Sequence, residues 1–217
     1  MTVILANGEF PSHPVPLHAL ASATQLYCCD GAIKKLSAYL QEGHIIAAST
    51  IYVVGDGDSE GFDSIALPQG YHVVYHHESE QDYNDLTKTM RLATSHSVED
   101  IVLIGATGLR EDQTLGNISL LSYYLAERFP LRSLVMLTNY GRFTPILTTT
   151  TFDSHPSQQV SIFSLSPEAR ITLHRLRYPW HHKPIRQWWQ CTLNEAIANA
   201  FTVEIEGEGE VIVYQTY

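Results

Sequence analysis

The stretch STIYVVGDGD, residues 49–58, decides the fold class of this chain. Its first part, Ser49–Val54, is rich in β-branched and apolar residues, which is typical of a strand buried on both faces of a sheet. Its second part, Gly55–Asp58, alternates glycines with carboxylates, which is typical of a tight polar turn at the end of such a strand. The stretch therefore predicts a buried parallel sheet with polar groups at the carboxyl ends of its strands.

The remainder of the first two thirds repeats this alternation of strand and helix. Further strands are expected at Val3–Ala6, Gln25–Cys29, Tyr71–Tyr75, Asp100–Ile104 and Ser133–Leu137. Helices are expected at Leu17–Ala23, Ala32–Glu42, Asn84–Ser95 and Thr114–Arg128. Because several of the strands are almost wholly apolar, we expect residues 1–141 to form an α/β domain with a parallel sheet covered on both faces.

The pattern of the chain changes after Arg142. Short strand-like runs follow at 148–151, 160–165, 171–176, 201–205 and 211–214, separated by Pro, Gly, Ser and Asn and without long helical periodicity. Residues 142–217 are therefore expected to form a separate all-β domain. Within it, Glu206–Glu210 has the sequence EGEGE and is expected to be a hairpin turn between the last two strands.

The overall composition limits the classes of function. Apolar residues make up 44% and charged residues 17% of the 217 residues, which is typical of a folded globular protein. The net charge of −10, without a block of Lys or Arg, argues against binding to nucleic acid. No apolar run reaches the ~18 residues of a membrane span. The first residues lack the pattern of a signal peptide, so we expect no membrane association and a cytoplasmic location.

Cysteines are few and show no functional spacing. Cys28 and Cys29 are adjacent and Cys191 is distant from both, which is the pattern of neither a disulfide framework nor a metal site. We expect all three to be buried, reduced thiols.

Polar residues follow three of the predicted strands. Ligand crevices in parallel sheets lie beyond the carboxyl ends of the strands, so Asp30, the turn 55–59 and the loop 105–108 are expected to converge at one edge. Asp56 and Asp58 are two residues apart in a glycine-containing turn and can face a single cation. The alternative is a polar turn that binds no ligand.

A second cluster lies in the segment QDYNDLTK, residues 81–88. If Asn84 opens the following helix, Asp82 and Asp85 lie around its first turn, where carboxylates can either bind a cation or cap the helix. Lys88 follows Asp85 by three residues on the same helix face, where it can pair with Asp85 or contact a phosphate.

A third cluster lies in residues 105–113, GATGLREDQ. Its loop, which includes Thr107 and Gly108, follows a buried strand and precedes a helix, so its backbone N–H groups can contact phosphate oxygens. The Gly-Lys-Ser/Thr ending of a Walker loop is missing. Arg110 is a planar, permanently charged donor for phosphate, and Asp112 can orient Arg110 or contact a nucleotide group.

In this order and context the motifs resemble those of the thiamine pyrophosphokinase family. The N-terminal motifs are DGA at 30–32, GDGDS at 55–59, QDYNDLTK at 81–88 and GATGLREDQTLGN at 105–117. The corresponding family patterns are DGGA, GDxDS, (K/Q)DxTD, and GGxxGRxDH/Q followed by a helix with Asn. In the C-terminal part, Ser164–Pro167, Leu176–Trp180 and Thr192–Glu195 are similar to the family's second-domain turn, its LxWPL strand and its TSNE segment. The resemblance covers nearly the whole chain.

The resemblance implies transfer of a diphosphoryl group from ATP to the hydroxyethyl group of thiamine, giving thiamine diphosphate and AMP, with Mg²⁺ as cofactor. It also implies a Rossmann-like N-terminal domain, a C-terminal β-sandwich that binds thiamine, and a homodimer with active sites at the subunit boundary. Carried over by motif, the catalytic and metal-site residues are Asp56, Asp58, Asp82 and Asp85. The ATP-site residues are Asp30, Gln81, Lys88, Thr107, Gly108, Arg110, Asp112 and Gln113, and the thiamine-site residues are Tyr178 and Asn194.

Three positions depart from the family patterns and leave alternatives open. Ala32 stands at the second glycine of the DGGA pattern. Tyr178 stands at the usual aromatic residue of the LxWPL strand, and Leu193 stands at the serine of the TSNE segment. The changes at Tyr178 and Leu193 allow an enzyme of the same scaffold that acts on another alcohol, such as a pterin or a modified thiamine. A non-catalytic nucleotide or thiamine sensor is a third hypothesis. Either Asp82 or Asp58 can accept the proton of the alcohol.

Overall fold

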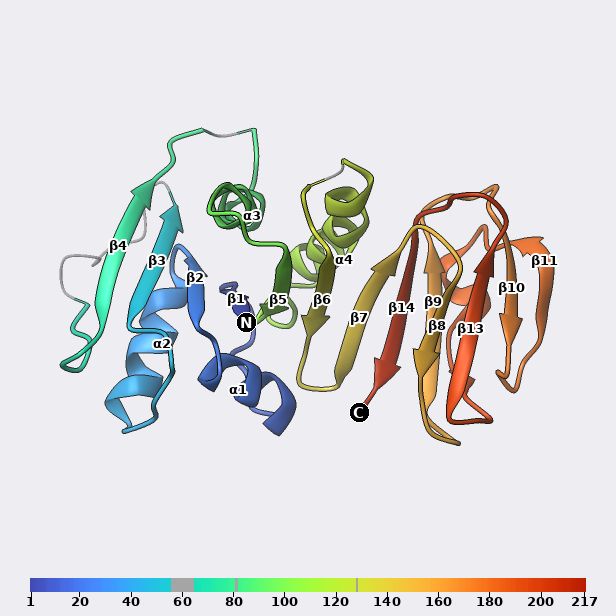
Figure 1. The fold of residues 1–217 in the computed structure, drawn as a ribbon, viewed down its shortest axis with the longest axis horizontal. Helices are drawn as coiled ribbons and strands as arrows, with labels where there is room; N and C mark the ends of the chain where they lie inside the picture. Colours follow the sequence, from blue (N-terminus) through green and yellow to red (C-terminus); the bar gives the residue numbers. More distant parts are fainter. Residues whose placement is uncertain (56–64, 81, 128) are drawn as a thin grey trace. The chain divides into compact units, whose positions relative to one another are not determined.

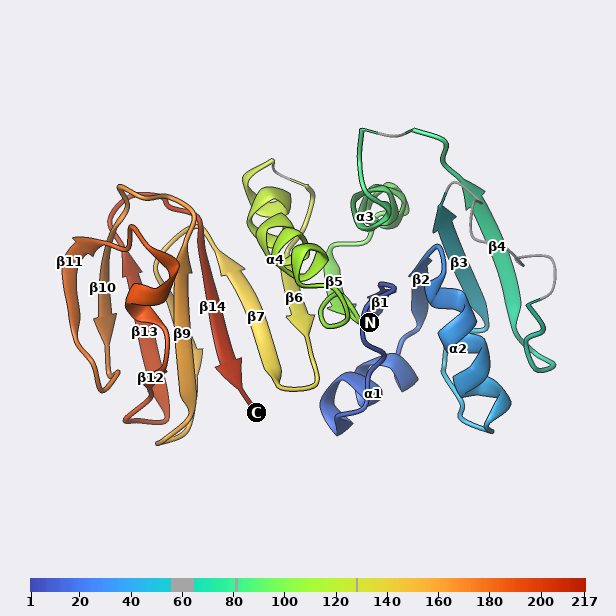
Figure 2. The same cartoon turned by 180° about the vertical axis from the view of Figure 1, so that it is seen from behind.

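The computed structural model describes residues 1–217 except 56–64, 81 and 128. The chain divides into two compact units. Unit 1 consists of residues 1–118 and 130–139, and unit 2 of residues 119–129 and 140–217. Unit 1 contains a sheet with helices and unit 2 is dominated by strands, as Figures 1 and 2 show from opposite sides.

Unit 1 is built on a parallel sheet. Its strands are β1 (Thr2–Leu5), β2 (Gln25–Cys29), β3 (Thr50–Gly55), β4 (His72–His77), β5 (Asp100–Ile104) and β6 (Ser133–Leu137). They lie in the order β6-β5-β1-β2-β3-β4, and each neighbouring pair is parallel. Each predicted strand of this sheet is present within two residues of its expected bounds, which confirms the predicted fold class.

Helices connect the parallel strands. They are α1 (Pro14–Ala21), α2 (Ala32–Gln41), α3 (Asp85–Ser95) and α4 (Glu111–Ala126). In α2, Ile33, Leu36 and Leu40 recur with the helical period and are buried in the core beneath the sheet. α1 and α2 connect strands that progress in one direction along the sheet, whereas α3 returns in the other direction. The right-handed crossover rule therefore places α3 on the opposite face of the sheet.

The strand order reverses between β1 and β5. From β1 the chain proceeds outward through β2, β3 and β4, and then returns through α3 to β5 on the other side of β1. The carboxyl ends of β1 and β5 therefore lie at the point where the strand order reverses, which is where ligands bind in folds of this kind.

Unit 2 contains two antiparallel sheets. Its strands are β7 (Gly141–Ile146), β8 (Thr150–Asp153), β9 (Gln159–Ser164), β10 (Arg170–His174), β11 (Trp180–Pro184), β12 (Asn194–Glu195), β13 (Ala200–Ile205) and β14 (Val211–Thr216), with a 3₁₀ turn, η2 (Trp188–Cys191). One sheet has the order β12-β9-β14-β7 and the other β11-β10-β13-β8. Alternate residues of both sheets, such as Val160 and Val211 from one and Ile171 and Phe201 from the other, form one core. This arrangement confirms the predicted β-sandwich.

The predicted hairpin turn at Glu206–Glu210 is wrong. The strand before it, β13, pairs with β8 and β10, whereas the strand after it, β14, pairs with β7 and β9. Residues 206–210 therefore connect the two sheets. Alternating Gly and Glu predicts a turn, but the pairing partners of both strands are distant in sequence and cannot be deduced from the turn.

The strand expected at Leu176–Trp180 forms only in part, because β11 begins at Trp180 and Leu176 makes a single bridge to Ala196. The three cysteines are free and buried, as predicted. Within the part of the chain that the structure describes, no helix is long and apolar enough to cross a membrane.

Candidate active site

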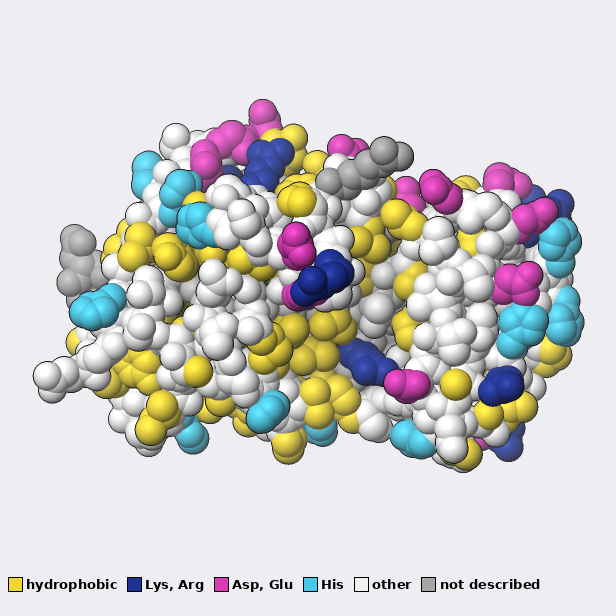
Figure 3. All heavy atoms as spheres, in the orientation of Figure 1, with side chains coloured by type: hydrophobic (Ala, Val, Ile, Leu, Met, Phe, Trp, Pro, Cys, Tyr) yellow, Lys and Arg dark blue, Asp and Glu magenta, His cyan; other side chains and the backbone are white. Residues whose placement is uncertain are grey.

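A cavity of about 640 Å³ lies at the carboxyl edge of the unit 1 sheet. It is lined by residues 6–8 after β1, by Cys29 at the end of β2, by residues 82–86 and 88 at the start of α3, and by residues 106, 108–110, 113 and 117 after β5. Acidic and basic side chains lie close together at the top of unit 1, over α3 and the segment that joins β4 to α3 (Figure 3). The cavity therefore occupies the crevice at which the strand order reverses.

The loops after β1 and β5 are joined by their backbones. The Gly8 N–H donates to the Gly105 carbonyl at 2.6 Å, and the Glu9 N–H donates to the Thr107 carbonyl at 2.8 Å. Thr107 lines a smaller neighbouring cavity together with Glu9 and Gly105, whereas Gly108 lines the large one. The predicted phosphate loop is thus held by the loop after β1.

Two side chains that the sequence did not single out support these loops. The Lys35 ammonium on α2 donates to the carbonyls of Asn7 at 2.8 Å and Gly8 at 2.5 Å, and burial lowers its pKa. The Asn117 amide on α4 donates to the Ala106 carbonyl at 2.8 Å. Asn117 is the last residue of the motif GATGLREDQTLGN, so the resemblance to the family pattern could have identified it. Nothing in the sequence distinguishes Lys35 from a surface lysine.

Asp30 folds against the ends of the adjacent strands. Its φ of 27° lies in the left-handed region, and its N–H donates to the Val54 carbonyl at 2.8 Å. A Cβ at Gly55 would lie 2.8 Å from Asp30 Oδ1, and a Cβ at Gly31 would lie 2.6 Å from Asn7 Nδ2. At Gly55 there is no room for a Cβ beside Asp30, so glycine lets the loops after β2 and β3 pack this closely, whereas at Gly31 the contact is with the end of the Asn7 side chain, which can move aside.

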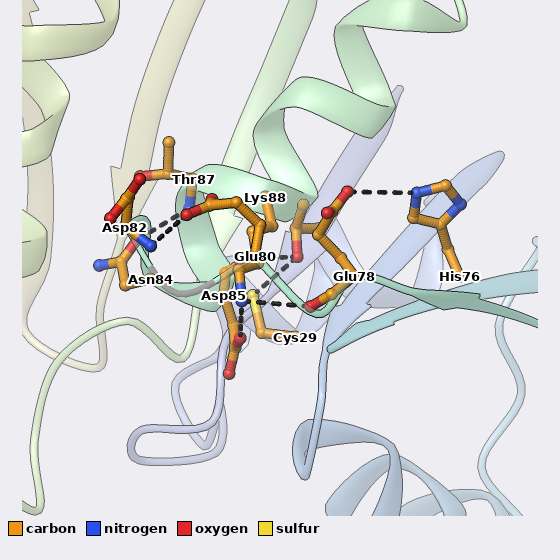
Figure 4. Close-up of polar contacts among 10 residues, drawn as sticks. Cys29, His76, Glu78, Glu80, Asp82, Asn84, Asp85, Thr87 and Lys88 are labelled. Atoms are coloured by element: carbon orange, nitrogen blue, oxygen red, sulfur yellow. Dashed lines mark hydrogen bonds and ion pairs between the residues drawn. The ribbon is translucent and has the colours of Figure 1, made fainter. Parts of the chain in front are cut away.

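Asn84 opens helix α3. Its Oδ1 accepts a hydrogen bond from the Thr87 N–H at 2.9 Å, which makes it the N-cap (Figure 4). Asp82 precedes the cap and Asp85 is the first helical residue, and both line the cavity. Because Asn84 caps the helix, capping does not explain either carboxylate.

Lys88 is a buried cation in the wall of the cavity. Its side chain is 4% exposed, and Nζ lies 3.8 Å from Asp85 Oδ1 and donates to the Glu78 carbonyl at 3.3 Å (Figure 4). The predicted pairing with Asp85 is therefore present. Lys88 also lines the cavity, where it can contact an anion.

The pKa of the Cys29 thiol is affected by burial, by Thr89 and by the carboxylates of Asp85 and Asp30. Burial raises the pKa of Cys29 to about 12, and a hydrogen bond with Thr89 at 3.3 Å opposes this effect. The negative charges of Asp85 and Asp30 raise the pKa further. The end of β2 and the start of α3 thus bring two carboxylates to one thiol.

Arg110 lines the cavity from the loop after β5 and is oriented by Asp112. Nε donates to Asp112 Oδ1 at 3.1 Å, and a terminal nitrogen donates to Oδ2 at 2.5 Å. This pair raises the pKa of Arg110 and lowers that of Asp112. Both side chains are exposed, so the pair contributes little to stability. Arg110 and Gln113 line the cavity.

Three predicted site residues, Asp56, Asp58 and Gln81, lie outside the described residues. Among the residues that the structure does describe, no group of three or more His, Cys, Asp or Glu side chains is placed to hold a metal ion. Asp82 and Asp85 are the carboxylates that this part of the chain brings to the cavity wall.

In unit 2 the structure brings Tyr178 and Asn194 together. The Asn194 side chain is buried; its Oδ1 accepts from the backbone N–H groups of Tyr178 at 3.0 Å and Glu195 at 2.8 Å, and its Nδ2 donates to the Tyr178 carbonyl at 2.8 Å. The Tyr178 side chain is 59% exposed. Asn194 therefore fixes the backbone that presents the Tyr178 ring.

The buried thiols predict how stability depends on pH. Burial raises the pKa of both Cys29 and Cys191 from 9.0 to about 12. Between these values the unfolded chain has released protons that the folded chain retains. The contribution to the free energy of unfolding is therefore full below about pH 9 and falls toward pH 12, by at most about 1.4 kcal/mol per pH unit for each thiol. Urea unfolding at about pH 8 and about pH 10.5 measures this loss.

The variant Cys29→Ala provides the control for this pH dependence. It lacks one of the three thiols whose pKa is raised by burial, so its free energy of unfolding should fall less steeply above about pH 9. A wild-type free energy of unfolding that stays constant over this interval contradicts the prediction.

Both parts of the chain match models of known protein families. Residues 17–132 match the family model of the thiamin pyrophosphokinase catalytic domain, and residues 141–214 match that of the thiamin pyrophosphokinase substrate-binding domain. No curated protein matches the chain in sequence.

Solved structures agree in fold over the full length of the chain. The thiamine pyrophosphokinase from Bacillus subtilis is 20% identical with a TM-score of 0.72, and the alignment covers 100% of this chain and 99% of that one. The enzyme from Candida albicans is 18% identical with a TM-score of 0.80, covering 100% and 89%. Yeast thiamin pyrophosphokinase is 16% identical with a TM-score of 0.77, covering 100% and 86%.

The catalytic-domain match alone spans more than half of the chain and includes every loop that lines the cavity after β2 and β5. The chain therefore belongs to the thiamin pyrophosphokinase family, as an enzyme that carries both the catalytic and the substrate-binding domain of that family.

Proposed function

We propose that the unit 1 cavity is the site at which this thiamine diphosphokinase binds ATP with Mg²⁺, before the diphosphoryl group passes to thiamine. One observation carries the proposal: Asp82, Asp85, Lys88 and Arg110 line a single cavity at the crevice where the strand order reverses. Carboxylates for a cation and cations for phosphate are the groups that such a transfer needs.

The residues present fit Mg²⁺. This ion prefers oxygen ligands, and it is usually held by one or two carboxylates together with substrate phosphates and water. Asp82 and Asp85 supply two carboxylates, and Asn84 performs the capping that would otherwise compete for them. From the sequence motifs we assign Asp56 and Asp58 to the same ion. When bound, Mg²⁺ neutralises charge on the triphosphate.

The side chains of the chain then position the reacting groups. Lys88 and Arg110 bind phosphate oxygens from α3 and from the loop after β5. The hydroxyl oxygen of thiamine attacks the β-phosphorus, the bond between that phosphorus and the α–β bridging oxygen breaks, and AMP leaves. The hydroxyl proton passes to a carboxylate, for which Asp82 and Asp58 are the candidates. Alignment of the alcohol with the phosphorus supplies much of the rate.

For thiamine we propose the exposed face around Tyr178. A thiazolium is a cation, and the open aromatic ring of Tyr178 can stack on it. The Asn194 side chain forms hydrogen bonds to the backbone of Tyr178 and Glu195, so we assign it the role of positioning the Tyr178 ring.

The direct test is to incubate the purified protein with ATP, Mg²⁺ and thiamine and to quantify AMP and thiamine diphosphate. We expect both products in equal amounts, and neither when Mg²⁺ is removed by a chelator. A pterin alcohol and thiamine analogues under identical conditions test the acceptor. Product from these alcohols but not from thiamine would contradict the proposed acceptor, and ATP binding without AMP release would indicate a sensor.

Replacing Asn194 by Ala is expected to impair the thiamine side alone. The change leaves the partly buried N–H and carbonyl of Tyr178 without their side-chain partner, which should lower the free energy of unfolding by about 1 kcal/mol. Because the Tyr178 ring loses its support, the KM for thiamine should rise about tenfold, as a loss of about 1.4 kcal/mol of binding implies. The KM for ATP should not change. Steady-state kinetics and urea unfolding measure these quantities.

Asn199→Ala, which changes an exposed asparagine of the same unit, is the matched control and should behave as wild type. A larger rise in the KM for ATP than for thiamine in Asn194→Ala would contradict the assignment.

We also propose that the enzyme is a homodimer with its active sites at the subunit boundary. Unit 2 exposes Trp189 and Leu193, whose side chains are 73% and 76% accessible, next to the segment that carries Asn194. Exposed apolar groups of this size favour a protein interface. Light scattering should give twice the 24.4 kDa of the chain.

A cytoplasmic location is proposed from the free, buried thiols and is tested by fractionation.

A further inference from the structure

Tyr83 is the only aromatic residue among the described residues that line the cavity. It lies between Asp82 and the N-cap Asn84, and its side chain is 37% exposed. The roles assigned above to the carboxylates, Lys88 and Arg110 make no use of it. An aromatic ring in a wall that is otherwise polar or aliphatic offers a flat apolar surface to a ligand.

The ring of Tyr83 is held in place from one side. The guanidinium carbon of Arg91 lies 3.6 Å from the centroid of the ring, which is within the range of a cation–π contact. Arg91 belongs to α3, so the contact ties the loop before the helix to the helix itself. A ring that is already oriented loses little conformational entropy when a ligand stacks on it.

The charge of Arg91 decides which part of the substrates suits this surface. Aromatic side chains bind both nucleobases and organic cations. The thiazolium of thiamine is a cation, and on the open face of the ring it would be repelled by the guanidinium behind that ring. Adenine is uncharged and is not repelled. The pair Tyr83–Arg91 therefore favours a neutral base over the cationic acceptor.

We propose that Tyr83, backed by Arg91, is the surface on which the adenine ring of ATP stacks. The inference rests on the proposed use of the cavity as the ATP site. The base lies on Tyr83 at the start of α3, and the phosphates contact Lys88, which lines the same cavity one turn into that helix. Stacking recognises the face of a base and not its edge, so this contact distinguishes large bases from small ones.

A fluorescent nucleotide tests the stacking directly and without turnover. The emission of 2-aminopurine is quenched when the base stacks on an aromatic ring, so the probe is 2-aminopurine riboside triphosphate with Mg²⁺. We expect quenching with the wild-type protein and with Tyr83→Phe, which keeps the ring. We expect no quenching with Tyr83→Leu at a saturating concentration of protein.

Kinetics tests which substrate uses the ring. Tyr83→Leu should raise the KM for ATP about tenfold, a loss equal to about 1.4 kcal/mol, and should leave the KM for thiamine within about twofold. The KM for UTP, whose base is smaller, should rise less than that for ATP. Tyr83→Phe should resemble wild type. Tyr75→Leu is the control, because Tyr75 is also half exposed in unit 1 but does not line the cavity.

Several results would overturn the proposal. Equal quenching with wild type and Tyr83→Leu would show that the base stacks elsewhere. A rise in the KM for thiamine with an unchanged KM for ATP would assign the ring to the acceptor. If Tyr83→Leu does not fold, the absence of quenching with wild type still contradicts the proposal. If wild type makes no thiamine diphosphate, the proposed function fails, while the emission measurement still decides whether Tyr83 binds a base.

Discussion

Replacing Asp85 by Asn is expected to lower kcat/KM for ATP by about a hundredfold or more, because it removes a negative charge that we propose to bind the metal ion. Asp85 lines the cavity, and Asn84, not Asp85, caps α3. Asparagine has the same shape as aspartate, so the fold should remain. The apparent affinity for Mg²⁺ should weaken together with the rate. Steady-state rates over a range of Mg²⁺ concentrations measure both effects.

Asp100→Asn is the matched control for this variant. Asp100 opens β5 at the amino end of the strand, where it binds Arg132 and Ser133, and it does not line the cavity. Its loss should alter stability slightly and leave the Mg²⁺ dependence unchanged. An Asp85→Asn enzyme with wild-type turnover at limiting Mg²⁺ would exclude Asp85 as a metal-site residue.

Replacing Lys88 by Met should reduce kcat/KM for ATP by about a hundredfold, because the triphosphate loses a cation in a site where water screens charge poorly. The Lys88 side chain is 4% exposed, and Met fills a similar volume without charge. Since burying a cation is itself costly, the free energy of unfolding should change by no more than about 1 kcal/mol. A large loss of activity with little loss of stability is the expected signature.

Lys34→Met changes an exposed lysine of the neighbouring helix α2 and should leave both quantities at their wild-type values. Comparable activity of Lys88→Met and Lys34→Met would remove Lys88 from the proposed phosphate contacts. Thermal unfolding of both variants shows whether either change acts through the fold.

Local sequence determined the elements of unit 1. Apart from β4, which contains three histidines, the parallel strands are short, mainly apolar runs, and α2 carries Ile33, Leu36 and Leu40 at helical spacing. Such patterns depend on neighbouring residues alone, so a single sequence contains them. The carboxyl ends of parallel strands share one edge, so the edge that carries the candidate site was predictable as well, whereas the reversal of the strand order came from the structure.

For the active site, sequence determined which residue types lie at the carboxyl edge but left their tasks open. Asp82 and Asp85 could have been caps or ligands. The structure shows that Asn84 is the cap, because its side chain accepts from the Thr87 N–H. Asp56 and Asp58 lie outside the described residues, and their part in metal binding stays a prediction from the motif.

Tertiary structure alone decided the contacts between distant segments. Residues 206–210 cross between sheets because β13 and β14 find partners far away in the chain. Lys35 holds the loop after β1 although it belongs to α2. In each case the deciding partner is far away in sequence, and periodicity and turn propensity carry no information about it.

This sequence by itself thus determined the fold class, the edge of the sheet that carries the candidate site and the resemblance to one family. The tertiary structure decided which side chains contact one another. Asn84 caps α3, Asn194 bonds to the backbone of Tyr178, and Arg91 packs against the ring of Tyr83. The physical reason is that strands and helices follow from local hydrophobic patterns, whereas hydrogen bonds and ring contacts depend on which loops the packed core brings together.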